Sequence, residues 1–299
     1  MTAQSHINDP AFVGLAEVLQ QYGSCEVLRY RKGKRITVAA VDDRIGSVVV
    51  KYIAKGASEI VARLSAVDRV KDELKFAVSR PIEFATDSKF FVQTRLAGEP
   101  VDVEKTDFSQ PLVFGMAAAI KSLHASSAFF DSRFDEISQR IRTERYLGLI
   151  QLQFPDTEQS IAAIQSKLAG LEEHIRARQA DLVPIHGSLH SHKWLLGDGR
   201  LVLVDFDRAA MGHAELDIAT LLAEFDYEAP DIAAKVNPAF LSQFPRHDPH
   251  TLLFYRAHKH LSKVYKASRH AQPELACHKV RRNLGRTARL LADVRATRQ

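Results

Sequence analysis

Apolar runs of strand length alternate with polar turns in the first hundred residues. Three runs, over 25–31, 35–41 and 47–53, are separated by Lys32-Gly33-Lys34 and by the polar segment 42–46. Turns with glycine between apolar runs predict antiparallel strands. The apolar spacing then predicts a helix over 58–76, strands over 82–85 and 89–95, and a short amphipathic helix over 10–22 before them all.

The pattern changes to a helical period after residue 97. Gly98-Glu99-Pro100 breaks the last strand and suits a linker. Beyond it, apolar residues recur every three or four positions over 112–123, 161–175 and 252–268, which predicts buried helix faces. The chain therefore predicts an α+β protein with a helical extension (1–24), a small β-rich lobe (25–97) and a larger helical lobe (98–299).

Composition narrows the class of protein without naming a chemistry. The 299 residues are 45% hydrophobic and 26% charged, which is typical of a globular protein with a sizeable core. Two isolated cysteines, Cys25 and Cys277, form no metal-binding pattern and favour a reducing cytoplasm. We expect no signal peptide and no membrane span, because no apolar run reaches about 18 residues.

Positive charge is concentrated at the C-terminus. Residues 278–299 hold seven Lys and Arg and one acidic residue, Asp293, so this segment has a net charge of +6. The whole chain has a net charge of +5, so the remaining residues sum to −1 (5 − 6). Val280, Leu284 and Leu291 recur at helical spacing, so we expect a C-terminal helix with a solvated basic face. A protein partner for this helix stays open, whereas nucleic acid is disfavoured because no aromatic residues are interleaved.

The chemistry-bearing stretch runs from His186 to Asp207. It begins with His186-Gly187-Ser188-Leu189-His190, continues through a strand and the turn Gly197-Asp198-Gly199, and ends in an apolar strand followed by Asp205 and Asp207. Asp-Gly between two apolar runs is a strong hairpin signal. Such a hairpin can hold a polar loop on one side and carboxylates on the other.

This stretch resembles the catalytic segment of the aminoglycoside phosphotransferase and choline kinase family, whose fold is related to the protein kinases. In that family the segment has the sequence His-Gly-Asp-Leu-His, then a hairpin, and then Ile-Asp-Phe or Ile-Asp-Trp. The resemblance rests on His186, Gly187, Leu189, His190, Leu195, Leu196, Asp205 and Phe206. It implies a bilobal kinase-like fold that binds ATP or GTP with Mg²⁺ and a small hydroxylated molecule. It also implies that Asp217, in a motif after the hairpin, holds the catalytic loop by hydrogen bonds.

Two departures from the family pattern change the implied mechanism. Ser188 stands at the catalytic Asp position, and Lys193 stands at the metal-binding Asn position five residues later. A hydroxyl is no base at neutral pH, and losing a positioned base costs on the order of 10²- to 10⁴-fold in rate. An ammonium about 4 Å from Mg²⁺ is repelled by roughly 8 kcal/mol at an effective dielectric constant of 20. Asp205 and Asp207 remain as candidate metal ligands.

The resemblance also implies nucleotide contacts in the β-rich lobe. Lys51 stands at the phosphate-binding lysine position, with Glu59 as its candidate partner. The strand taken alone favours an ordinary exposed lysine, but its position within the pattern favours the phosphate contact. Arg31 and Lys34 lie in a basic hairpin at the position of the phosphate-covering loop, with a solvated turn as the alternative. Gln93 begins the segment that would meet the adenine.

Two hypotheses follow from the altered loop. The first is a degenerate (pseudo)kinase that binds a nucleotide or small ligand with little phosphoryl transfer. The second is an active ATP-dependent phosphotransferase that uses Lys193 as a charge and substrate-assisted deprotonation. A Ser-His hydrolase built on Ser188 is disfavoured because the sequence lacks a G-x-S-x-G elbow. A zinc site at His186, His190 and His192 is disfavoured because their spacing matches no zinc template.

Overall fold

The computed structural model describes residues 7, 9–84, 89–197 and 199–292. The chain divides into two compact units. The first comprises Met1–Val101, Ser126–Phe130 and His192–Ala209, and the second comprises Asp102–Ala125, Asp131–Ser191 and Ala210–Gln299. The hairpin therefore groups with the β-rich unit, while the polar loop before it belongs to the helical unit.

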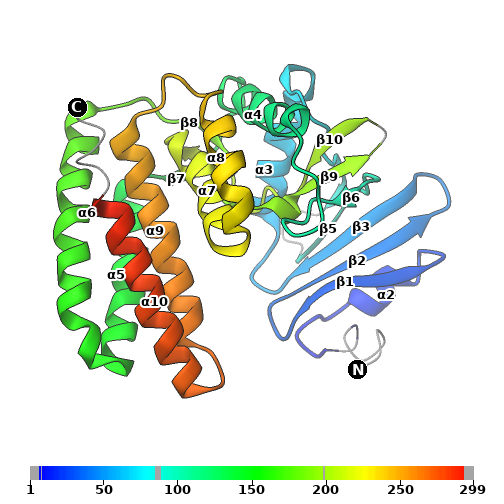
Figure 1. Ribbon diagram of the computed structural model, residues 1–299. Helices are drawn as coiled ribbons and strands as arrows, with labels where there is room; N and C mark the ends of the chain where they lie inside the picture. Colours follow the sequence, from blue (N-terminus) through cyan, green and yellow to red (C-terminus); the bar gives the residue numbers. More distant parts are fainter. Residues whose placement is uncertain (1–6, 8, 85–88, 198, 293–299) are drawn as a thin grey trace. The chain divides into compact units, whose positions relative to one another are not determined.

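A five-stranded antiparallel sheet forms the first unit, with strand order β1-β2-β3-β5-β4 (Figure 1). The strands are β1 (Cys25–Arg31), β2 (Arg35–Asp42), β3 (Gly46–Ile53), β4 (Pro81–Phe84) and β5 (Phe90–Thr94). The three meandering strands and the two later ones follow the sequence prediction closely. Ala85, the predicted end of the fourth strand, lies outside the described residues.

Each face of this sheet buries a different set of apolar side chains. Ile36 and Val38 of β2 and Val50 of β3 pack with Phe12 and with Leu15 of the short helix α2 (Leu15–Leu19). The opposite face packs Phe91 against the helix α3 (Ser58–Arg69). Successive residues of a strand point to opposite faces of the sheet. The Lys51 side chain therefore lies on the same face as Phe91, and the side chain of its neighbour Val50 lies on the other face.

Two predicted helices in this unit are shorter than expected. The helix predicted over 10–22 is reduced to α2, because Gly14 takes a left-handed conformation with φ of 80° immediately before it. The helix predicted over 58–76 ends at Arg69, and a 3₁₀ turn follows over Lys71–Glu73. The chain then runs beside the hairpin, where Ala77 donates to the carbonyl of Leu201 and accepts from the N–H of Leu203.

The hairpin predicted over 186–207 forms two strands of a small sheet in the first unit. The strands are β9 (Trp194–Gly197) and β10 (Arg200–Leu203), and β6 (Glu99–Pro100) pairs with β9 to complete the order β10-β9-β6. Gly197 approaches the backbone of Ala97 so closely that an added Cβ would lie 2.6 Å from its carbonyl oxygen.

The second unit is mainly helical, and α9 packs against α5, α6, α7 and α10 (Figure 1). A short sheet of order β7-β11-β8 accompanies the helices. The helices are α4 (Gln110–His124), α5 (Glu136–Gln153), α6 (Glu158–Arg178), α7 (Glu215–Glu228), α8 (Pro230–Leu241), α9 (Pro249–Ser268) and α10 (Pro273–Ala292), and the strands are β7 (Arg133–Phe134), β8 (Val183–Ile185) and β11 (Ala210–Gly212).

The described residues therefore confirm the α+β class, with a β-rich first unit and a larger helical second unit. The stripe over 161–175 is buried in α6 as predicted. The predicted C-terminal helix is α10, whereas Val294, Arg295 and Arg298 of the basic segment lie outside the described residues. Within the described part of the chain, none of the helices combines the length and apolar character that crossing a bilayer requires.

Candidate functional site

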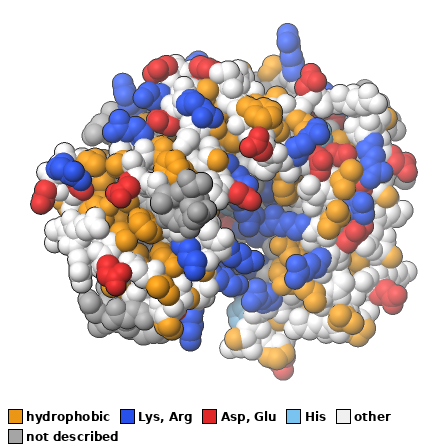
Figure 2. Space-filling model, turned by 180° about the vertical axis from the view of Figure 1, so that it is seen from behind, with side chains coloured by type: hydrophobic (Ala, Val, Ile, Leu, Met, Phe, Trp, Pro, Cys, Tyr) orange, Lys and Arg blue, Asp and Glu red, His pale blue; other side chains and the backbone are white. Residues whose placement is uncertain are grey.

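A cavity of about 860 Å³ opens beside the sheet of the first unit. Twenty residues line it, and five of them are basic against two acidic ones, so its wall carries a positive excess. Figure 2 shows Lys and Arg side chains gathered in a hollow of the molecular surface. The basic residues of the cavity are Arg29, Arg35, Lys51, Arg95 and Lys193.

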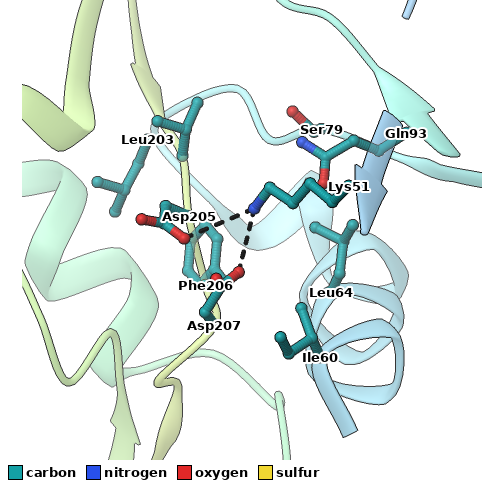
Figure 3. Close-up of a pocket in the computed structure, with 10 residues that line it drawn as sticks. Lys51, Ile60, Leu64, Ser79, Gln93, Leu203, Asp205, Phe206 and Asp207 are labelled. Atoms are coloured by element: carbon teal, nitrogen blue, oxygen red, sulfur yellow. Dashed lines mark hydrogen bonds and ion pairs between the residues drawn. The ribbon is translucent and has the colours of Figure 1, made fainter. Parts of the chain in front are cut away.

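Lys51 is a buried lysine held by two carboxylates of the hairpin segment. Its Nζ lies 3.1 Å from Asp207 Oδ1 and 3.5 Å from Asp205 Oδ1, and both carboxylates point toward it (Figure 3). Burial acts to lower the pKa of Lys51, but attraction to Asp207 and Asp205 outweighs it and raises the pKa above the usual value. Lys51 is therefore a fixed positive charge in the wall of the cavity.

Asp205 follows β10 in a left-handed conformation, with φ of 70°. A residue other than glycine rarely adopts this conformation, and such outliers persist where their surroundings fix them. Here the fixing contact is the Lys193 ammonium, which donates directly to Asp205 Oδ2. Burial raises the pKa of Asp205, but the charges of Lys51 and Lys193 overcome that effect and hold it far below its usual range.

Asp207 is engaged on both oxygens as well. Its Oδ2 accepts from Arg35 NH1 at 3.0 Å, while Oδ1 faces Lys51. Two carboxylates thus meet three cationic side chains, and the five groups together carry +1. The donor set does not fit Mg²⁺, because both oxygens of each carboxylate already face a cation.

The other predicted nucleotide residues are placed differently from Lys51. Gln93 on β5 is buried and lines the cavity as well as the smaller pocket around Lys51. Arg31 and Lys34 are exposed at the tip of the β1–β2 hairpin and do not line the cavity. Arg29 and Arg35, the outermost basic residues of the same hairpin, line it instead.

The expected partnership of Glu59 with Lys51 is wrong. Glu59 lies in the first turn of α3, where its side chain is 82% exposed and pairs with Arg63 four residues later. Arg63 in turn donates to the backbone carbonyl of Asp207 at 2.9 Å. The two carboxylates after β10 therefore supply the negative charge that the helix was expected to provide.

In the second unit, Asp217 holds the start of the polar loop. Its carboxylate accepts from the backbone N–H of His186 at 2.7 Å and of Gly187 at 2.9 Å, and His124 Nε2 lies 3.3 Å away. Asp217 is fully buried, which acts to raise its pKa, but these hydrogen bonds and the nearby imidazoles lower it. The structure thus confirms the holding role that the resemblance implied.

Glu224 holds the end of the same loop and was missed in the sequence. Its carboxylate accepts from the N–H of Ser191 at 2.5 Å and lies 3.5 Å from His190 Nδ1. Glu224 follows Asp217 by seven residues on α7, and two helical turns place both on one face. The seven-residue spacing of these two carboxylates was the signal that could have found Glu224.

Ser188 lies between these two anchors and is half-buried. Its carbonyl accepts from the N–H of His190, but its hydroxyl has no hydrogen-bond partner within the described parts of the chain. The backbone of the loop is therefore held at both ends, and the Ser188 hydroxyl lies between the two anchors.

Comparisons with known proteins agree with this architecture. A family model described as "Phosphotransferase enzyme family" matches residues 31–255. Among solved structures, choline kinase LicA from Streptococcus pneumoniae is 18% identical with a TM-score of 0.62, covering 93% of this chain and 96% of its own. A choline/ethanolamine kinase family protein from Mesorhizobium loti is 18% identical with a TM-score of 0.61, and the alignment covers 98% of both chains.

A thermostable mutant of aminoglycoside phosphotransferase APH(4)-Ia is 13% identical with a TM-score of 0.68, covering 93% of this chain and 97% of its own. A comparison with curated protein sequences gives no significant match. The structural similarities establish the protein-kinase-like α+β fold, and the family model spans most of the sequence. The chain belongs to the phosphotransferase enzyme family that includes the aminoglycoside phosphotransferases.

Proposed function

We propose that this protein is a degenerate kinase that binds a nucleoside triphosphate through its phosphates, with little phosphoryl transfer. One observation carries the proposal: the Lys193 ammonium donates a hydrogen bond to Asp205, which stands at the position of the family's metal-binding carboxylate. An ammonium in this place supplies fixed positive charge without a metal ion. Nucleotide binding is therefore independent of Mg²⁺.

The charge of the cavity supports an anionic ligand. Five Lys and Arg side chains against Glu99 and Asp205 leave the lining residues at +3. A triphosphate carries a comparable negative charge, and a buried, fixed lysine such as Lys51 suits its oxygens. Related proteins bind nucleotides: one structure of LicA contains AMP, and one of APH(4)-Ia contains ADP with hygromycin B.

The loop of the second unit supports weak catalysis. Ser188 offers no base, so an acceptor hydroxyl would lose its proton without help from this position.

The cysteines Cys25 and Cys277 form no disulfide. This suits the reducing cytoplasm expected from the sequence, where ATP or GTP would be the ligand.

Calorimetric titration with ATP and with GTP, each with and without Mg²⁺, tests the proposal. We expect the same affinity in both conditions and a loss of at least tenfold in Lys51→Ala. The exposed Lys55→Ala, four residues away, serves as the matched control and should bind like the wild type. Binding that requires Mg²⁺ would contradict the proposal, as would the absence of binding to either nucleotide.

An active phosphotransferase that acts on a hydroxyl of a small molecule is the second candidate. The observation in its favour is the intact holding of the loop backbone by Asp217 and Glu224. The double variant Ser188→Asp with Lys193→Asn separates the candidates by ATP turnover. Turnover should rise from near zero if the protein is degenerate and should fall if Lys193 belongs to an adapted mechanism.

A further inference from the structure

Two histidines and an aspartate meet in the helical second unit. His174 comes from the last turns of α6, Asp248 is the N-cap of α9, and His250 lies in the first turn of α9. Their ligand atoms all lie within 4.8 Å of one another. The two imidazole rings stand side by side with centroids 4.4 Å apart.

The separations match those of a small metal centre. Zinc binds histidine nitrogen and carboxylate oxygen at about 2.0–2.2 Å with tetrahedral geometry, so its ligand atoms lie roughly 3.3 Å apart. His174 Nε2 and Asp248 Oδ2 are already 3.3 Å apart. The remaining separations are no more than 4.8 Å, and a rotation of the partly buried His250 side chain would be needed to shorten them.

The three side chains leave the required atoms available. Asp248 uses Oδ1 for capping α9, where it accepts from the N–H and the hydroxyl of Thr251, both at 2.7 Å. Its Oδ2 faces His174 instead. Within the described part of the chain, neither ring nitrogen of His250 has a hydrogen-bond partner. A metal ion would be shared by two imidazole nitrogens and by Asp248 Oδ2, which would exchange its contact with Arg178 for the ion.

The local charge favours a cation by a small margin. Glu215 Oε1 accepts from the N–H of Asp248 at 2.8 Å and adds a second negative charge. Arg178 opposes them, with NH1 3.6 Å from Asp248 Oδ2 and 4.0 Å from Glu215 Oε1. The three charged groups sum to −1, and the 40% exposed side chain of Arg178 can turn toward solvent when a metal enters.

We propose that His174, Asp248 and His250 bind a divalent transition metal ion, with Zn²⁺ as the test ion and water in the fourth position. The imidazole ligands select zinc, cobalt, nickel or copper over magnesium and calcium, which prefer oxygen ligands. The bound ion would join the end of α6 to the start of α9. Because Arg178 and the N-terminus of α9 oppose a cation, we expect micromolar affinity.

Calorimetric titration of the chelator-treated, full-length protein with Zn²⁺ measures this site. We expect one equivalent to bind in the wild type, with affinity reduced at least tenfold in His250→Ala and in Asp248→Asn, which retains a capping oxygen. His278→Ala, an exposed histidine on α10, is the matched control and should leave the titration unchanged. Since the chain has 13 histidines, the difference between His250→Ala and His278→Ala is the decisive quantity.

Two further measurements distinguish a built site from adventitious binding. Co²⁺ should give the visible absorption of a tetrahedral site in the wild type and lose it in His250→Ala, and excess Mg²⁺ should not compete. Arg178→Gln should tighten Zn²⁺ binding about tenfold by removing the competing charge. Equal Zn²⁺ affinity in the wild type and in His250→Ala would overturn the proposal. The absence of Zn²⁺ binding to the wild type would also overturn it. In either case, His174 and Asp248 would form an ion pair without a metal ion.

Discussion

Asp217 shows how one residue sets the geometry of the polar loop. Its buried carboxylate receives two backbone N–H groups and faces His124. An amide in its place would keep one accepting oxygen and turn an NH₂ group toward donors. We expect Asp217→Asn to lower the free energy of unfolding by about 2–4 kcal/mol at pH 7, because hydrogen bonds to a buried charge are lost. Urea denaturation measures the change.

The acid dependence of the same variant supplies its control. The folded-state pKa of Asp217 is lowered, so its contribution is present above the unfolded pKa of about 3.9 and is lost as the pH falls through the lower folded value. The difference between wild type and Asp217→Asn should therefore shrink below about pH 4. A difference that stays constant down to the acid transition would show that packing, and not the charge, stabilises the loop.

Asp226 extends the argument to three helices. Its carboxylate, on α7, forms hydrogen bonds with Arg256 and His260 of α9 and with Asn237 of α8. Burial acts against the charge, but hydrogen bonds from His260 and Arg256 lower the pKa to about 2. Stability from this shift is present above about pH 4 and is lost as the pH falls through about 2, and it amounts to about 2 kcal/mol.

Asp226→Asn should therefore be less stable than the wild type by about that amount at pH 7. The two proteins should converge as the pH approaches 2. Urea midpoints measured between pH 2 and 7 follow the difference directly. Parallel curves throughout this range would contradict the assignment of the stability to the charged form.

At the scale of elements, substitution of glycine by alanine should have opposite effects on stability at Gly212 and at Gly170. A Cβ on Gly212 of β11 would lie 2.7 Å from the carbonyl oxygen of Phe134 and 2.4 Å from a methyl group of Ile185, whereas a Cβ on Gly170 of α6 meets nothing within 4 Å. Gly212→Ala should lower stability by about 1–3 kcal/mol through overpacking. Gly170→Ala should raise it by about 0.5–1 kcal/mol through helix propensity. Thermal unfolding of both variants checks the pair.

The elements also show which parts of the fold are encoded locally. β1 to β3 match their predicted ranges, because alternating apolar residues and glycine turns determine them within a few residues. The end of α3 at Arg69 does not follow from any local signal. The chain there is drawn out by the hydrogen bonds of Ala77 to Leu201 and Leu203, which lie far away in sequence.

The same distinction applies to the candidate site. Lys51, Lys193 and Asp205, which motif spacing singles out, all line the cavity. Ser188 is singled out by the same spacing, and its role stays a prediction. Glu59 was assigned wrongly because the partner of a buried lysine depends on tertiary contact, and the contact is with Asp205 and Asp207 after β10. Arg35 belongs to the basic hairpin that the sequence offered for phosphate contacts, but its pairing with Asp207 could not be predicted, since Asp207 lies in a distant segment.

The basic face of α10 is partly occupied within its own unit. Arg281 pairs with Asp156 at 2.7 Å, and the Arg286 guanidinium lies 5.3 Å from the centre of the Tyr227 ring. These contacts use part of the positive charge that the sequence analysis left open for a partner. Binding of a protein to this helix stays a prediction.

At the scale of the whole molecule, the two proposed ligand sites belong to different units, and hydrogen exchange can test both. ATP should slow exchange in the backbone amides of β3, β9 and β10, which carry or adjoin Lys51, Lys193 and Asp205. Zn²⁺ should slow exchange at the end of α6 and the start of α9, around His174 and Asp248. Each ligand stabilises the residues it contacts because it binds the folded state alone.

Variants make this experiment decisive. In Lys51→Ala, ATP should protect none of the strands while Zn²⁺ still protects α6 and α9, and in His250→Ala the pattern should be reversed. Loss of both protections in one variant would indicate unfolding and not loss of a site, and far-ultraviolet circular dichroism would reveal it. Protection by ATP that persists in Lys51→Ala would mean that the nucleotide binds outside the basic cavity, and the proposed role of Lys193 would fall with it.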